Sequence, residues 1–210
     1  MAYVARPYRR RRNATPGPLT RPFAWSGMFQ GYDAYVFPHE HRHISAVIIR
    51  PTADKQLGVL RHVEAFDAAC ANVPGLSDWT DPRLATPTSG VLLGVRLLNV
   101  YRPQLGRPGL VALGDAVATT APTAGRGVAM ASMQIGLLLG LIDGGVDLVD
   151  VGAPFGARCD AEILPWVEDH MATDTERGQR WLGAELDLAR PLTSRSILDA
   201  SAADPQILEH

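Results

Sequence analysis

The chain has 210 residues and a net charge of −2, with 46% hydrophobic, 20% charged and 7% aromatic side chains. This is the composition of a globular protein, and it excludes a disordered chain, a collagen and a coiled coil. The charge is unevenly spread, because residues 1–142 carry 15 basic and 8 acidic side chains whereas residues 143–210 carry 5 and 14.

Six arginines precede the first acidic residue, Asp33. A basic segment of this kind suits nucleic acid or another acidic ligand. It has no interleaved aromatic platform and no known nucleic-acid motif. A solvated, arginine-rich strand is therefore the preferred interpretation, and we expect no nucleic-acid partner.

Cysteine usage and hydropathy indicate a cytoplasmic protein. Cys70 and Cys159 are too few and too far apart for a disulfide framework or a zinc site. The basic N-terminus lacks the apolar segment of a signal peptide. The longest uncharged apolar stretch, residues 127–142, is shorter than the roughly 20 residues that span a membrane. We expect no membrane partner.

The N-terminal part of the chain is predicted to form strands. Residues 1–12 alternate aromatic and basic side chains, and residues 27–37 and 44–50 are rich in aromatic and β-branched ones. The polar segment 38–43 joins the last two as a hairpin. A strand that begins at the first residue needs neighbours on both sides or a protected edge.

Three histidines, at positions 39, 41 and 43, alternate along the chain. Alternate residues of a strand share a face, which would suit a metal ion. Pro38 and the polar residues around it place the histidines in a turn instead. We expect surface histidines and no metal site.

The middle of the chain is predicted to mix a helix with strands. Residues 54–71 have apolar side chains at the three-and-four spacing of an amphipathic helix, which Pro74 ends. Residues 91–101 are predicted to form a strand, and residues 109–113 a short one buried on both faces.

Two helices are predicted in the rest of the chain. Residues 126–142 are apolar nearly all round, which is typical of a helix that is buried on every side. Residues 160–186 favour a second helix, started or interrupted by Pro165. The tail from Pro191 is weakly patterned.

The segment from Gly109 to Met130 is the most informative. An apolar strand ends in Gly114-Asp115, a loop follows, and glycines open a helix. This order presents one carboxylate and a row of free N–H groups to the same cavity. Helix N-terminal amides favour an anion or a polarised carbonyl, and Asp115 can accept hydrogen bonds from the hydroxyls of a sugar-like chain. A simpler interpretation is a connection with a helix-capping acid and flexible glycines.

This segment resembles the second FAD motif of FAD-dependent oxidoreductases and monooxygenases of the para-hydroxybenzoate hydroxylase type. The matching residues are Gly114, Asp115, Ala116, Pro122, Gly125 and Gly127. The resemblance implies that Asp115 binds the ribityl chain of FAD, and that the backbone of Gly125, Arg126 and Gly127 contacts flavin N1 and O2. Such contacts stabilise the negative charge of the reduced flavin. Ala118 and Ala124 stand where many members have histidine and glycine.

Upstream features resemble the substrate-domain sheet of the same oxidoreductases, and the resemblance covers about residues 3–142. They are Tyr3-x-x-Arg6-x-Tyr8-Arg9, Phe37-Pro38, the strand around Ile44 to Arg50, Ala65-Phe66, Trp79 and Asn99-x-x-Arg102. The expected fold class is α+β, an antiparallel substrate-domain sheet plus a strand-loop-helix segment of an FAD-binding domain. The expected domains are a sheet with one helix (1–106), the flavin-contacting segment (107–145), and a helical region with a tail (146–210).

The motif that holds the FAD pyrophosphate, a strand followed by G-x-G-x-x-G, is missing. The nearest imitation, Gly125-Arg126-Gly127, is followed by Met130 where the third glycine belongs. We expect the chain to correspond to the C-terminal portion of a flavoprotein whose dinucleotide-binding half lies elsewhere or is lost.

The expected function is that of a partial FAD-dependent oxidoreductase, monooxygenase-like, acting on an apolar small molecule. No residue is identified as a catalytic acid or base. The absence of G-x-S-x-G, P-loop and H-E-x-x-H motifs argues against a serine hydrolase, a nucleotide triphosphatase and a zincin. The alternative is a non-catalytic binding module that has lost its cofactor site.

The helix over 126–142 predicts an exposed apolar patch. In the family that the chain resembles, the equivalent helix packs against the dinucleotide-binding domain, and Gly136 and Gly140 would permit close approach. We therefore expect self-association of the chain or docking of the missing half.

Overall fold

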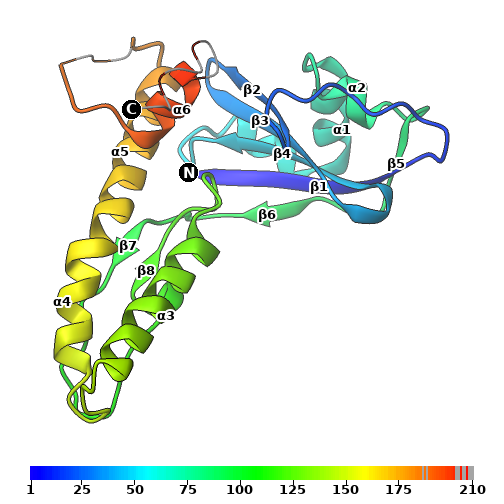
Figure 1. Cartoon of the computed structure of the whole chain (residues 1–210). Coiled ribbons are helices and arrows are strands. Elements are labelled where there is room, and N and C mark those ends of the chain that lie inside the picture. The colour runs from blue at the N-terminus through cyan, green and yellow to red at the C-terminus, as the bar shows by residue number, and fades with distance from the viewer. Residues whose placement is uncertain (186, 188, 202–203, 205–206, 208–210) are drawn as a thin grey trace. The chain divides into compact units, whose positions relative to one another are not determined.

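The computed structural model describes the chain apart from residues 186, 188, 202–203, 205–206 and 208–210. The chain forms two compact units (Figure 1). The sheet unit comprises Met1–Arg96 and Gly178–Ala184, and the helical unit comprises Leu97–Arg177 and Glu185–His210. Strands and helices both contribute, which confirms the α+β class. The domain boundaries expected after residues 106 and 145 stay a prediction.

The sheet unit is built on an antiparallel sheet with strand order β2-β3-β4-β1-β5, in which β6 also pairs with β1. The strands are β1 (Ala2–Arg10), β2 (Trp25–Phe29), β3 (Tyr32–Pro38), β4 (His43–Arg50), β5 (Ala85–Pro87) and β6 (Leu92–Gly94). The strand that begins the chain thus has neighbours on both sides, β4 on one and β5 with β6 on the other.

The prediction of one continuous strand over 27–37 is wrong. This segment is a hairpin, β2 and β3, with a turn at Gln30-Gly31. Gly31 has φ +91, a left-handed conformation that glycine adopts without steric cost. The predicted turn between β3 and β4 is present, since the His39 N–H donates to the His43 carbonyl at 2.8 Å and His41 has φ 56.

Two short helices replace the single helix predicted over 54–71, and both pack on one face of the sheet (Figure 1). They are the 3-10 helix η2 (Leu57–Arg61) and α1 (Val63–Asn72), with α2 (Ser77–Thr80) following. The core between helices and sheet includes Val4 and Ile48 of the strands and Phe66 and Trp79 of the helices.

A smaller apolar cluster lies on the opposite face of the sheet. Trp181 packs there against Tyr35 and Ile49, with Tyr3 and Phe37 at its margin. The Trp181 indole N–H donates to Asp33 Oδ1 at 2.9 Å. Asp33 is fully buried, so this donor helps to satisfy a buried carboxylate.

In its described residues, the helical unit has a two-stranded ladder, one 3-10 helix and four α-helices. Its elements are β7 (Val100–Tyr101), the 3-10 helix η3 (Gly114–Ala116), β8 (Ala118–Thr119), α3 (Gly127–Asp143), α4 (Gly152–Glu162), α5 (Leu164–Trp181) and α6 (Ser194–Ser201). The last residues of α5 belong to the sheet unit. The core of the helical unit includes Val117, Met130, Phe155, Ile163 and Val167.

The strand predicted over 109–113 is absent. The Gln104 side chain pairs with the backbone of Ala112, donating to its carbonyl at 2.8 Å and accepting from its N–H at 2.9 Å. A side chain thus supplies the bonds that a neighbouring strand would have made, and Leu110 is 49% exposed rather than buried. The strand predicted over 91–101 is also divided, into β6 and β7.

The helix predicted over residues 126–142 is α3. The helix predicted over 160–186 is two helices, α4 and α5, that meet at Ile163. Pro165 lies in the first turn of α5, where proline is tolerated because its missing N–H would be unpaired anyway. The expected end at Leu186 lies outside the described residues, and α5 ends at Trp181.

Candidate functional site: the turn and loop before α3

The Gly-Asp turn is fixed to the helix that follows it. The Gly114 N–H donates to the side-chain Oε1 of Gln134, a fully buried residue of α3, at 2.8 Å. Gly114 has φ +60, a conformation that strains any residue with a Cβ. The next side chain, Asp115, is exposed. The turn therefore presents an exposed carboxylate from a backbone that is bonded to α3.

The start of α3 is open. Gly125 has φ +67, and a Cβ added at Gly125 or Gly127 would meet nothing within 4 Å. Within the described chain, no side chain caps the helix at Arg126. The first N–H groups of an α-helix have no intrahelical partner. Together with the helix dipole, they form a site for an anion or a polarised carbonyl.

The predicted residues lie on η3, on the loop before α3 and at the start of α3. Gly114 and Asp115 lie on η3, which packs against α3. Pro122 and Gly125 lie in the loop between them, and Gly127 is the first residue of the helix. A carboxylate and a set of uncapped amides are therefore offered by adjoining segments of the helical unit.

The Arg126 side chain is engaged within the same unit. Its guanidinium donates to Asp169 Oδ2 at 2.5 Å and to the Ser194 hydroxyl, and it lies 5.5 Å from the centre of the Trp166 ring. Burial raises the pKa of the Asp169 carboxyl, but hydrogen bonds from Ser194 and Arg126 outweigh it, so that the pKa lies below its ordinary value. The Arg126 guanidinium is thus held by Asp169 and Ser194.

The acidic and histidine side chains of α5 that support this region were not predicted from the sequence. Asp169, His170 and Asp174 point polar atoms at the loop before α3. A signal was present, since His170 and Asp174 are spaced four residues apart and share one helix face.

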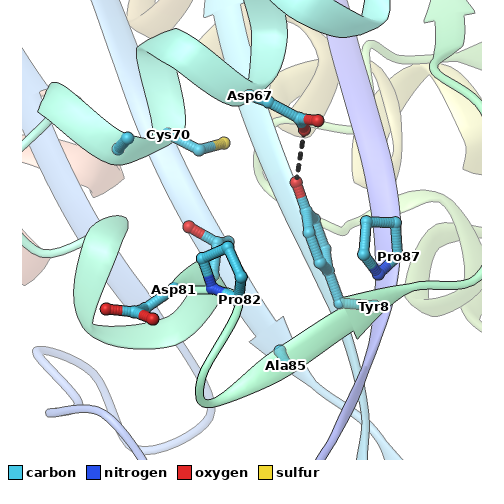
Figure 2. Close-up of a pocket in the computed structure, with 9 residues that line it drawn as sticks. Tyr8, Asp67, Cys70, Asp81, Pro82, Ala85 and Pro87 are labelled. Atoms are coloured by element: carbon cyan, nitrogen blue, oxygen red, sulfur yellow. Dashed lines mark hydrogen bonds between the residues drawn. The ribbon is translucent and has the colours of Figure 1, made fainter.

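A small pocket of about 130 Å³ lies elsewhere, in the sheet unit (Figure 2). The Tyr8 hydroxyl points at Asp67, to which it donates at 3.3 Å, and Arg6 also pairs with this carboxylate. Burial raises the pKa of the Cys70 thiol to about 12, and burial raises that of Tyr8 as well. Both groups are protonated at neutral pH, so the pocket offers neither a thiolate nor a phenolate.

In the described part of the chain, no three His, Cys, Asp or Glu side chains gather closely enough to hold a metal ion. Among the helices there, none is both long and apolar enough to cross a bilayer.

No family model matches the sequence, and no curated protein matches it. The fold does match solved structures of flavin-dependent halogenases and FAD-dependent monooxygenases. The chain therefore has the fold of a portion of an FAD-dependent monooxygenase-type protein.

Three of these structures illustrate the match. CmlS, a flavin-dependent halogenase, is 13% identical with a TM-score of 0.65, over 97% of this chain and 38% of its own. PqsL, a probable FAD-dependent monooxygenase from Pseudomonas aeruginosa, is 20% identical with a TM-score of 0.56, over 87% and 50%. A variant of HpxO from Klebsiella pneumoniae, complexed with FAD, is 13% identical with a TM-score of 0.54, over 100% and 50%. The chain spans half or less of each of these proteins.

Proposed function

We propose that the chain is the substrate-domain and flavin-contacting portion of an FAD-dependent oxidoreductase of the monooxygenase type. The observation that carries this proposal is an exposed Asp115 carboxylate on η3, which packs against α3, together with the uncapped N-terminus of α3. Both lie in a fold similar to that of flavin-dependent halogenases and monooxygenases.

The residues present fit one part of FAD. The Asp115 carboxylate would accept hydrogen bonds from the ribityl hydroxyls. The backbone amides of Gly125, Arg126 and Gly127 would face the N1–C2=O edge of the flavin, where reduction places negative charge. The empty space around Gly125 and Gly127 leaves room for a planar ring to approach the backbone. Bound flavin would supply the redox chemistry.

The sequence has no strand followed by G-x-G-x-x-G, so it offers no cradle for the FAD pyrophosphate. We propose that a dinucleotide-binding half, outside the sequence described here, completes the site. The substrate would be an apolar small molecule, in keeping with the partly exposed Tyr3 and Phe37 on the sheet face that carries Trp181.

The face of α3 that is turned to solvent supports this proposal. Val128, Ile135 and Leu139 are 81%, 49% and 52% exposed, and Gly136 and Gly140 lie on the same side. Apolar surface of this kind marks an interaction site. We propose that the dinucleotide-binding half docks on it, and that the chain alone self-associates through it.

We further propose a reducing, cytoplasmic setting. Both cysteines, Cys70 and Cys159, are buried free thiols, one in each unit. Alkylation of the unfolded, unreduced protein followed by mass spectrometry should find both unpaired.

The test compares three flavins that share the ring. FAD and riboflavin both carry the ribityl chain, only FAD carries the pyrophosphate and adenosine, and lumiflavin carries neither. Titrations followed by NMR should give weak binding, with FAD and riboflavin alike and shifts centred on residues 114–116 and 125–129. Asp115→Asn should weaken riboflavin binding about tenfold, the value of a charge-assisted hydrogen bond, and leave lumiflavin unchanged.

The exposed His41→Asn substitution is the matched control, and it should change none of the three affinities. Tight, stoichiometric FAD binding would contradict the absence of a pyrophosphate site. Absence of any flavin-induced shift near Asp115, with the chain folded, would favour a binding module that has lost its cofactor.

A further inference from the structure

Two side chains of α5, His170 and Asp174, hold the loop before α3. The Thr123 hydroxyl lies 3.1 Å from His170 Nε2 and donates to Asp174 Oδ1 at 3.3 Å. Asp174 also accepts from Arg177 at 2.8 Å. Thr123 is thus bound to two groups, one helical turn apart, on the same face of α5.

A second connection runs from Asp174 to the beginning of the loop. The Asn99 amide donates to Asp174 Oδ2 at 2.7 Å, and Asn99 Oδ1 accepts from the backbone N–H of Ala121 at 2.7 Å. The Arg126 pair with Asp169 closes the other end. The loop from Ala121 to Arg126 is therefore held by α5 at its beginning, its middle and its end.

The protonation state of His170 follows from this arrangement. When the single hydroxyl hydrogen of Thr123 goes to Asp174, His170 Nε2 carries the ring hydrogen and donates to Thr123 Oγ1. Nδ1 is then the unprotonated nitrogen. The ring is fully buried, and no described residue makes a hydrogen bond to Nδ1. A second proton would have no acceptor.

Charged groups of both signs face the ring. Asp174 and Asp169 favour the imidazolium, whereas Arg126, on the loop, and Arg177, on α5, disfavour it. Burial has the largest effect, and the pKa of His170 lies below its ordinary value. Burial of the ring thus favours neutral His170 over the imidazolium.

We propose that His170 and Asp174 are positioning residues for the loop Ala121–Arg126, and that the loop keeps its place only while His170 is neutral. That this loop contacts flavin rests on the proposed function, whereas the clamp itself does not. Its consequence is that protonation of one buried histidine changes how the α3 amides are presented.

The test measures hydrogen exchange of the Ala121 amide by NMR in the full chain, without flavin. Ala121 is buried, and its N–H reports on the connection through Asn99 to Asp174. The reference is the Val73 N–H, which donates to the Ala69 carbonyl in the sheet unit. After correction for intrinsic rates, the Ala121 protection factor should fall about tenfold relative to Val73 between about pH 8 and pH 5.5.

Two variants separate positioning from general stability. His170→Gln can still donate to Thr123 and cannot titrate, so it should keep Ala121 protected and abolish the pH dependence. Thr123→Val removes the contact but keeps the side-chain shape, and it should lower the protection of Ala121 about tenfold at both pH values. His41→Gln, at an exposed position, should behave as the unaltered chain.

An unchanged pH dependence in His170→Gln, or unchanged protection in Thr123→Val, would overturn the proposal. The result is independent of flavin binding. If the exchange data are as expected and the flavin titrations fail, then the proposed function alone is wrong.

Discussion

Gln134 and Gly114 are joined by a hydrogen bond of 2.8 Å from the glycine N–H to the glutamine Oε1. Gln134 is fully buried in the middle of α3, where a polar side chain is costly unless it is paired. Its Nε2 has no hydrogen-bond partner among the described residues. The hydrogen bond of the Gln134 side chain is therefore the bond that fixes the Gly-Asp turn.

Replacing Gln134 by methionine should destabilise the chain by about 1 kcal/mol, because the partly buried N–H of Gly114 loses its acceptor while the side-chain volume is kept. Urea unfolding measures the loss. Gln56→Met, at an exposed position, should leave the free energy of unfolding nearly unchanged. Equal stability of the two variants would mean that the turn does not depend on this bond.

Gly127→Ala should separate stability from binding. The added Cβ enters empty space at an ordinary φ, so the helix should be as stable or slightly more stable. The same methyl group would obstruct a flavin ring over the amides, and riboflavin affinity should fall. Gly136→Ala, on the same helix with equally open surroundings, should raise stability by up to about 1 kcal/mol without affecting riboflavin. If both variants bind riboflavin alike, the ring does not approach Gly127.

The stability of the chain should decline in mildly acidic solution. The folded pKa of His170 lies below the ordinary value of 6.5, so below that pH the unfolded chain takes up a proton that the folded chain does not. The free energy of unfolding should fall by at most about 1.4 kcal/mol per pH unit from this group, until the pH reaches the folded pKa. Urea titrations at several pH values measure it. The His170→Gln variant should show a shallower decline, and identical curves would contradict the assignment.

The solvent-facing side of α3 should govern association. Leu139→Glu places a charge on the exposed apolar face and should reduce light scattering and apolar-dye binding without loss of stability. Leu137→Glu, two residues away, alters a side chain that packs against the core of the helical unit and should destabilise it. A chain that stays monomeric and dye-silent before any substitution would show that this face is not an interaction surface.

The parts that sequence predicted well are those where local chemistry decides the structure. β1, the turn at His41 and α3 follow from side-chain alternation, backbone requirements and a long apolar run. The hairpin turn at Gly31 was overlooked, although a glycine between two strand-forming runs is a turn signal.

The rest depends on contacts between residues distant in sequence. Nothing local indicates that the Gln104 side chain would pair with Ala112, or that α5 would reach the loop through His170 and Asp174. The carboxylate and glycines of the candidate site were predicted from their order. The side chains that support them were not predicted, because these contacts form only when the folded chain brings α5 next to the loop.

The pairing of Gln104 with Ala112 closes a loop that is bonded once more to the helical unit, where the Gly109 N–H donates to the Val149 carbonyl at 3.0 Å. A glutamine amide carries the same donor and acceptor as a peptide group. The Gln104 side chain therefore closes this loop and fixes Ala112, two residues before the Gly-Asp turn. Gly106, with φ +63 and open space around it, lies between the Gln104 pairing and the Gly109 bond. Related sequences can therefore differ in length here, and a reporter peptide can be spliced in, without displacing the Gly-Asp turn.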